Sequence, residues 1–147
     1  MTLRLRAMPL APFERDGLKA ALNKAGLAVD VNVPASLFWR FETDSDVPVG
    51  FGALELHGRS ALLCAVVTLP PLRRSGFGRA IVSALEQEAQ LHGARAIYLA
   101  TADEKDFFAR LGYARCKPSA VPAAIKSSAQ FASLTRAPTA VMVKRVK

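Results

Sequence analysis

Arg-Arg-Ser-Gly-Phe-Gly-Arg, residues 73–79, is the stretch on which the fold assignment depends. It follows the apolar run 61–69, which is typical of a strand, and precedes residues 80–89, whose apolar side chains recur at helical spacing. A strand therefore leads through a basic turn with two glycines into the start of a helix. Backbone N–H groups at a helix start lack intrahelical partners, and glycine lets an anion approach them closely. We therefore expect this stretch to bind phosphate groups.

The two glycines match neither of the common nucleotide fingerprints. Ile81 stands where the Rossmann fingerprint has its third small residue, and no Gly-Lys-Ser/Thr element of a Walker loop is present. An ordinary turn between a strand and a helix remains the alternative at this point, because arginine and glycine are common in such turns.

Length and composition indicate one globular domain over residues 1–147, with 51% hydrophobic residues. No run reaches the roughly 18 apolar residues of a membrane span, so no membrane partner is expected. The N-terminal segment lacks the apolar centre of a signal peptide. Cys64 and Cys116 lie in apolar or strand-like surroundings, which indicates free thiols in a reducing compartment and predicts a cytoplasmic location.

The net charge of +8 is spread along the chain and is dense only at residues 73–79 and 144–147. Neither zinc-finger spacing nor an aromatic nucleic-acid signature accompanies it, so we expect no nucleic-acid partner and no metal site.

Apolar periodicity, glycines and prolines divide the chain into alternating strands and helices that predict a mixed sheet flanked by helices, an α/β class in the broad sense. Asp103 is expected to cap a short helix, and residues 119–138 are expected to be irregular or in short helices. Strands are predicted at residues 2–8, 37–41, 47–56, 61–68, 97–100, from 113 onward and at 139–146; helices are predicted at 13–25, after residue 79 up to 91, and at 103–111.

Two motifs and the element order resemble the GNAT superfamily of acyl-CoA-dependent N-acetyltransferases over nearly the whole chain. The first motif is Pro70-x-x-Arg73-x-x-Gly76-x-Gly78 after a strand, and the second is the aromatic-glycine run 107–113, Phe-Phe-Ala-Arg-Leu-Gly-Tyr. The resemblance implies a GNAT-like fold (α+β in some schemes), with a mostly antiparallel central sheet and helices on both faces. It also implies acetyl-CoA (coenzyme A) as cofactor, an amine as acceptor and a possible homodimer.

The C-terminal part is similar to one branch of that superfamily, the N-acetyltransferases associated with arsenic-resistance operons. The similarity lies in residues 101–108, 121–127, 131–134 and 140–142. It implies an amino-acid-like or organoarsenical amine as substrate. Thr135-Arg136 stand where that branch tends to carry Cys-Pro, which leaves the substrate open.

The resemblance assigns the cofactor to the loop and to the strand before it. Charge is expected from Arg73 and Arg79, and the strand is expected to splay from its neighbour so that its backbone is free for the pantetheine arm; a fully paired strand is the alternative. Backbone groups for the pyrophosphate are expected from Arg74, Ser75, Gly76, Phe77, Gly78 and Arg79, and those for the pantetheine arm from Val66, Val67 and Thr68.

Catalysis requires a base for the amine and an acid for the leaving thiolate. Glu55 is the first candidate for the base. His57 is the second candidate, although it is expected at an exposed hairpin tip. Phe108 stands where many family members have a tyrosine acid, so Tyr98 is considered as a substitute, although it can equally be structural. Cys64 is expected to fill space rather than to act as a nucleophile.

Three functions fit these residues. The first is an N-acetyltransferase that moves acetyl from acetyl-CoA to a primary amine of a small molecule by direct attack in a ternary complex. The alternatives are a protein or peptide N-acetyltransferase and a non-catalytic acyl-CoA-binding domain, the latter suggested by Phe108.

Overall fold

The computed structural model describes residues 4–11, 14–24, 36–69 and 76–146. The helices and strands follow the predicted order, and most boundaries differ by one or two residues from the predicted ones. The strands are β1 (Arg6–Pro9), β2 (Ser36–Glu42), β3 (Pro48–His57), β4 (Ser60–Thr68), β5 (Ala96–Thr101), β6 (Ala114–Arg115) and β7 (Ala140–Arg145). The helices are α1 (Arg15–Lys24), α2 (Phe77–Leu91), α3 (Lys105–Arg110), α4 (Ala123–Lys126) and α5 (Ala129–Leu134), with a 3-10 turn at Pro118–Ala120.

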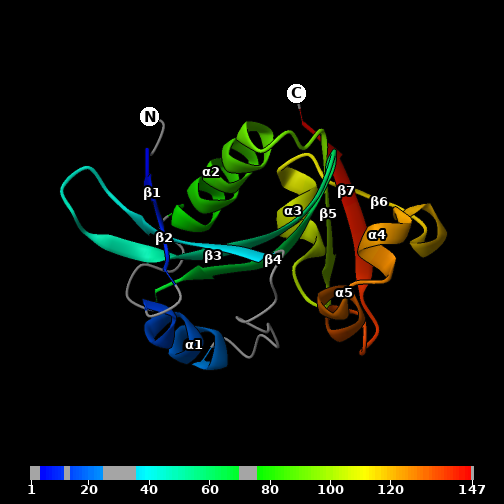
Figure 1. Cartoon of the computed structure of the whole chain (residues 1–147), viewed down its shortest axis with the longest axis horizontal. Coiled ribbons are helices and arrows are strands. Elements are labelled where there is room, and N and C mark those ends of the chain that lie inside the picture. Colours follow the sequence, from blue (N-terminus) through cyan, green and yellow to red (C-terminus); the bar gives the residue numbers. More distant parts are fainter. Residues whose placement is uncertain (1–3, 12–13, 25–35, 70–75, 147) are drawn as a thin grey trace.

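The strands form one seven-stranded sheet in the order β1-β2-β3-β4-β5-β7-β6. Every pairing is antiparallel except that of β4 with β5, which is parallel. The predicted mixed, mostly antiparallel sheet is therefore confirmed. The α2 helix provides the crossover that a parallel pair needs, and Figure 1 shows it lying over the sheet.

Helices cover both faces of the sheet, as predicted (Figure 1). One apolar core lies under α2 and α3 and includes Trp39, Phe41 and Leu85. A second core lies under α1, α4 and α5 and includes Leu18 and Phe131. Residues of β2 alternate between the two cores, because successive side chains of a strand point to opposite faces.

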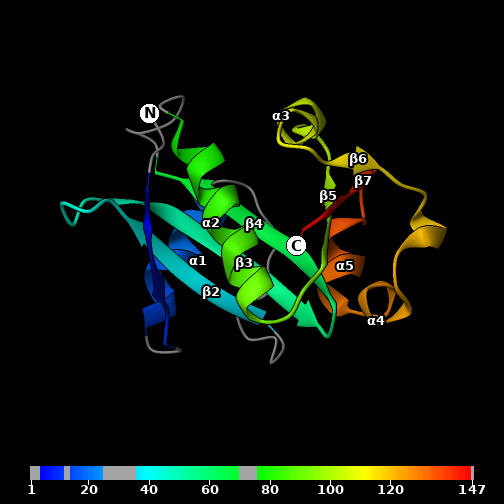
Figure 2. The same ribbon diagram turned by 90° about the horizontal axis from the view of Figure 1, so that it is seen from above.

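Two glycines of β3 allow α2 to lie close to the sheet, across β3 and β4 (Figure 2). A Cβ atom at Gly52 would lie 2.7 Å from Leu85 Cδ1, and one at Gly50 would lie 2.9 Å from Ile81 Cδ1. A side chain at Gly52 would therefore push against α2, whereas one at Gly50 would first collide with the Val67 carbonyl of β4. The apolar residues of α2 that face the sheet recur at helical spacing: Ile81, Val82, Leu85 and Ala89.

The β4 strand has one sealed edge and one open edge. Its antiparallel pairing with β3 runs from Ser60 to Thr68, with one irregularity at Cys64. Its parallel pairing with β5 covers only Ser60 to Leu62. Beyond that point the two strands diverge, as Figure 1 shows. The expected splay of this strand is therefore present.

Two local expectations are wrong. Asp103 does not cap α3, because Glu104 is the N-cap residue and its backbone N–H donates to Thr101 Oγ1 at 3.0 Å. The strand after Tyr113 is only the two residues of β6. In the part of the chain that the structure describes, no helix has the length and apolarity needed to cross a bilayer.

Candidate cofactor-binding and active site

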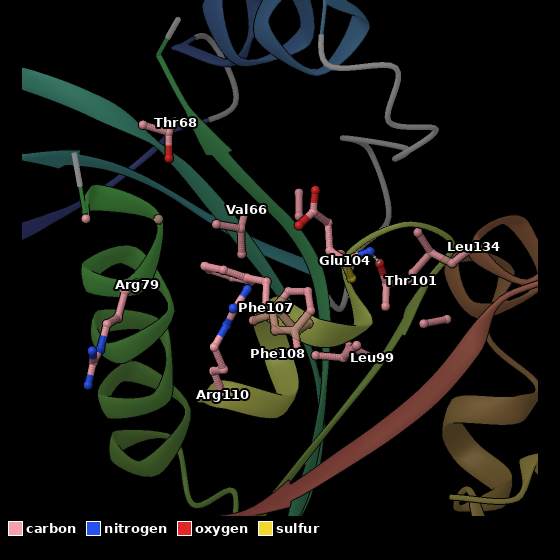
Figure 3. Close-up of a pocket in the computed structure, with 16 residues that line it drawn as sticks. Val66, Thr68, Arg79, Leu99, Thr101, Glu104, Phe107, Phe108, Arg110 and Leu134 are labelled. Atoms are coloured by element: carbon pink, nitrogen blue, oxygen red, sulfur yellow. Dashed lines mark hydrogen bonds between the residues drawn. The ribbon is translucent and has the colours of Figure 1, made fainter. Parts of the chain in front are cut away.

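A cavity of about 700 Å³ lies where β4 and β5 diverge. The start of α2 forms one wall and α3 forms another (Figure 3). Its lining residues are Leu63, Cys64, Ala65, Val66, Thr68, Gly76, Gly78, Arg79, Leu99, Ala100, Thr101, Glu104, Phe107, Phe108, Arg110 and Leu134.

The cavity passes through the plane of the sheet. Leu63 and Val66 belong to the core under α2 and α3, whereas Cys64 and Ala65 belong to the core on the other face. Two neighbouring residues share a face because the pairing steps from Ala65 to Leu63 and leaves Cys64 as a bulge. A ligand that enters beside α2 would therefore contact residues from both faces of the sheet.

The hydrogen-bond pattern of β4 determines which backbone groups face the cavity. The Leu69 N–H donates to Val49 O at 2.9 Å, which makes these two residues a hydrogen-bonded antiparallel pair. Because such pairs alternate along the ladder, the backbone of Val67 faces β3, and that of Val66 and Thr68 faces the open edge. Val66 and Thr68 line the cavity as predicted. Val67 was predicted with them, but its backbone is directed to the sealed edge.

The first turn of α2 brings part of the predicted phosphate loop to the cavity. Gly76 has φ +82°, a left-handed conformation that glycine adopts without a steric penalty, and it is the N-cap of the 15-residue helix. Gly78 lies at the junction of α2, α3 and β4: a Cβ atom there would be 3.6 Å from both Phe107 and Thr68. Arg79 lies exposed at the cavity, and Phe77 packs against the core instead. The predicted residues Arg73, Arg74 and Ser75 lie outside the described residues.

The α3 wall is built from aromatic rings that pack edge to face. Phe108 packs edge-on against Phe107, with ring centroids 5.0 Å apart, and against Tyr113 at 5.6 Å. Tyr113 donates its hydroxyl to Glu86 Oε2 at 3.0 Å, and Lys144 pairs with the same carboxylate at 3.1 Å. Burial and the neighbouring Glu86 raise the pKa of Tyr113 far above its usual range. Tyr113 is therefore a structural residue, and Phe108 offers the cavity no proton donor.

Two charged residues of the α3 region line the cavity and were not predicted. Figure 3 shows the Arg110 guanidinium extending toward Phe107, and the Glu104 carboxylate lying near β4. Among the described residues, no cation pairs with Glu104. In the sequence, Arg110 stands out only as part of the aromatic-glycine run. No spacing of residues in the sequence predicts that Glu104 lines the cavity.

Glu55 and His57 form a pair on β3. The Glu55 side chain is 1% exposed, and His57 Nε2 lies 2.6 Å from Glu55 Oε1. Because an ionised carboxylate only accepts, the imidazole N–H is the donor. Glu55 Oε2 has no hydrogen-bond partner among the described residues. The expectation of an exposed His57 is wrong, because its side chain is 17% exposed and anchored to Glu55.

Glu55 lies on β3 beside β4, but it is not among the residues that line the cavity. Its cross-strand partner is Leu62, and Cys64, which lines the cavity, is the next residue of β4 on the same face. Burial raises the pKa of the Cys64 thiol well above its usual range, and the nearby Glu55 charge raises it further. The thiol therefore stays protonated near neutral pH, as expected for a residue that fills space.

Tyr98 lies in the same cross-sheet row as Glu55. It is paired with Leu62 of β4 and contributes to the core under α1, α4 and α5. It is not among the residues that line the cavity. Within the described ranges, no group of three or more His, Cys, Asp or Glu side chains is arranged to hold a metal ion.

The family model described as "Acetyltransferase (GNAT) family" matches residues 5–113. A curated relative, N-alpha-acetyltransferase 80 of Mus musculus, is 42% identical over 59 residues. That match covers 40% of this chain and 19% of the mouse protein.

Solved structures share the fold at low sequence identity. N-acetylglutamate synthase from Neisseria gonorrhoeae, complexed with coenzyme A and L-arginine, has a TM-score of 0.77 at 13% identity. The alignment covers 99% of this chain and 34% of the synthase chain, so this chain spans about a third of that protein. The ribosomal-protein-S18-alanine N-acetyltransferase from Escherichia coli has a TM-score of 0.69 at 14% identity, with 97% and 94% of the two chains covered.

Proposed function

The chain belongs to the GNAT acetyltransferase family, and on that premise we propose that it transfers an acetyl group from acetyl-CoA to the primary amine of a small molecule. Acetyl-CoA is the cosubstrate, consistent with the coenzyme A bound in the gonococcal synthase. The observation that carries the proposal is the cavity at the open edge of β4, with a glycine-capped helix start at its mouth.

In this proposal different residues around the cavity bind different parts of the cofactor. Backbone N–H groups at residues 76–79, together with the positive end of α2, bind the pyrophosphate. Arg79 adds charge, as does the predicted Arg73. The backbone N–H groups of Arg74 and Ser75 are predicted to add further hydrogen-bond donors. The outward-facing backbone of Val66 and Thr68 binds the pantetheine amides, and one N–H of this edge binds the thioester oxygen.

The reaction proposed is direct attack by the amine while both substrates are bound. Cys64 supports this order, because its protonated, buried thiol is a poor nucleophile for a covalent acetyl intermediate. Glu55 is the proposed base, supported by its buried carboxylate and by Oε2, which has no hydrogen-bond partner among the described residues. In this proposal it accepts the proton that the amine must lose.

The acid for the leaving thiolate remains a prediction. Tyr98 shares the cross-sheet row with Glu55 but does not line the cavity. A thiol with an ordinary pKa of about 8.5 leaves as a thiolate at modest cost near neutral pH, so a dedicated acid is not required.

Release of free thiol from acetyl-CoA across a panel of amines tests the proposal. The panel contains amino acids, polyamines, amino sugars and an amino-acid-like organoarsenical. We expect acetyl-CoA binding by calorimetry and amine-dependent thiol release for at least one small molecule. Binding without turnover would instead assign a non-catalytic acyl-CoA-binding domain, and an absence of binding would refute the cofactor assignment.

The same panel with N-terminal peptides tests a second candidate, a protein or peptide N-acetyltransferase. The 59-residue match to the mouse N-alpha-acetyltransferase 80 favours this candidate. Turnover of peptides but not of small amines would support it.

An organoarsenical acceptor is the finer proposal for the small-molecule case. Two of the segments that resemble the arsenic-resistance branch, 121–127 and 131–134, fall in or beside α4 and α5, and Ile125 and Phe131 of these helices share a core with Cys64. Leu134 also lines the cavity. Growth protection of a sensitive host against amine-bearing organoarsenicals, lost in Glu55→Gln, is the direct test.

A further inference from the structure

One charged residue that lines the cavity has no part in the proposed reaction. Glu104 lies between β5 and α3, its side chain lines the cavity, and its carboxylate makes no hydrogen bond to the helix that it precedes. Within the described ranges, this carboxylate has neither an ion pair nor a hydrogen-bond partner. Its charge is therefore free to act on a ligand in the cavity.

The strand register places Glu104 opposite the middle of the open edge of β4. The parallel pairing aligns Leu62 with Tyr98. The same register, continued along the diverging strands, brings Thr101 opposite Ala65. Glu104 is fixed to that point of the wall, because its backbone N–H donates to Thr101 Oγ1 at 3.0 Å. Figure 3 shows its carboxylate directed toward β4.

The proposed placement of the cofactor brings its acyl end to the same part of the cavity. The phosphates are placed at the start of α2, which lies beside Thr68, since a Cβ atom at Gly78 would be 3.6 Å from Thr68 Oγ1. The pantetheine arm then follows the open edge away from α2, toward Leu63, where β4 approaches its pairing with β5. An acyl group on the sulfur therefore lies beyond Val66, in the part of the cavity that Glu104 faces.

The charges of the cavity are separated along this path. Arg79 belongs to the first turn of α2. Arg110 follows Phe107 by one turn of α3, and Phe107 lies beside Gly78 of α2. Glu104 stands at the other end of α3, about 9 Å from Arg110 at roughly 1.5 Å of rise per residue. Among the described lining residues, the cations thus lie toward the phosphate half of the cavity and the one acid lies toward the acyl half.

From this arrangement we infer that Glu104 selects the acyl donor: its carboxylate faces the acyl group and disfavours acyl chains that end in a carboxylate. The donors accepted are neutral short-chain acyl-CoA thioesters. The inference rests on the proposed function and adds the class of donor to it. At an effective dielectric constant between those of protein and water, two carboxylates about 7 Å apart repel enough to weaken binding about 10-fold.

Two thioether analogues of coenzyme A test the inference, because they bind without reacting. S-butyl-coenzyme A carries a neutral chain, and S-carboxypropyl-coenzyme A carries a chain of the same carbon number that ends in a carboxylate. In the wild type, we expect isothermal titration calorimetry to give a Kd about 10-fold higher for the carboxylated analogue. Equal affinities of the two analogues would overturn the inference.

Substitution at Glu104 separates charge from shape. Glu104→Gln keeps the size of the side chain and removes its charge, so we expect the two analogues to bind within about 2-fold of each other. Glu104→Lys is expected to reverse the preference. A difference that persists unchanged in Glu104→Gln would assign the selection to the shape of the cavity and overturn the role of Glu104.

Asp103→Asn is the matched control. Asp103 is the neighbouring acid, is exposed and is not among the residues that line the cavity. Its substitution changes the net charge of the protein by the same amount as Glu104→Gln, and we expect it to keep the wild-type difference between the analogues. Loss of the difference in both variants would show that the overall charge of the protein, and not Glu104, sets the preference.

The same titrations distinguish failure of the inference from failure of the proposed function. Equal binding of both analogues refutes the donor selection and keeps the cofactor assignment. Absence of S-butyl-coenzyme A binding refutes the cofactor assignment itself. The titrations contain no acceptor, so a preference that depends on Glu104 supports the inference even where no amine is acetylated.

Discussion

The two edges of β4 differ in what their backbone groups do. Toward β3 the strand is paired from Ser60 to Thr68 apart from the bulge at Cys64, and toward β5 only its first three residues are paired. The same nine residues therefore stabilise the sheet on one side and leave backbone donors and acceptors free on the other. Unpaired backbone groups are costly when buried and dry, so a long open edge inside a domain indicates a ligand that forms the missing bonds.

The difference also explains why a bulge lies at Cys64. A regular strand would send alternate side chains to alternate faces all the way through the open region. The extra residue places Cys64 and Ala65 on one face, so small side chains line the path on the side where Glu55 lies. One irregularity thus determines which side chains of β4 line the cavity on each face of the sheet.

The largest expected effect comes from blocking the mouth of the open edge. In Gly76→Asp, we expect the acetyl-CoA Kd to rise by about 100-fold, because the carboxylate repels phosphate and covers the backbone donors. The measurement is isothermal titration calorimetry. Gly93→Asp is the matched control, since Gly93 also has positive φ (+92°) but lies beyond the other end of α2 with open space around it. Equal weakening in both variants would remove the loop from the cofactor site.

A second prediction separates the two edges at neighbouring residues. Proline removes one backbone N–H, so Val66→Pro takes a donor from the open edge and Val67→Pro takes one from the sealed edge. We expect Val67→Pro to lose about 3 kcal/mol or more of unfolding free energy, because a ladder bond is broken. Val66→Pro loses less stability, but kcat falls about 100-fold if its N–H binds the thioester oxygen. The measurements are urea unfolding and thiol release.

The reverse pattern, with Val66→Pro unfolded and Val67→Pro stable but inactive, would show that the strand faces have been assigned the wrong way round.

The smallest effect concerns the two thiols. Burial raises the pKa of both Cys64 and Cys116, and Cys64 is the more buried. Because a raised pKa leaves little thiolate near neutral pH, we expect slow alkylation by iodoacetamide that speeds up as the pH rises, with Cys116 modified first. Peptide mass spectrometry gives the order. Rapid reaction of Cys64, or an acetyl adduct on it after incubation with acetyl-CoA alone, would contradict direct attack.

Much of the fold was predictable because its signals are local. The alternation of β2 and the helical spacing of α2 follow from a few consecutive residues, and Gly76 marked the helix start. The site is less local. Whether Val67 faces the cavity depends on which pairs of the β3–β4 ladder are hydrogen-bonded, and no single-strand pattern carries that information.

Dependence on strand pairing also explains why the surroundings of Glu55 were not predicted. The sequence indicated Glu55 as a candidate base. Its cross-strand partner Ser36 is distant in the sequence and becomes a neighbour only through the β2–β3 register. His57 was expected to be exposed because residues at a hairpin tip usually are. Its hydrogen bond to Glu55 forms because β3 continues through His57.

A substitution at the β3 glycine that faces α2 can change the separation between this helix and the sheet in one direction only. Gly52 already has the smallest side chain that exists, and a Cβ atom there would lie 2.7 Å from Leu85 Cδ1, so a larger residue presses α2 away from β3. A Cβ atom at Gly50 would first collide with the Val67 carbonyl of β4. The separation between α2 and the sheet sets the distance between the N-terminus of this helix and the open edge of β4. Single substitutions at Gly52 are therefore expected to widen the entrance beside α2 rather than to narrow it. A variant library at Gly52 is expected to accept larger acyl donors, not smaller ones.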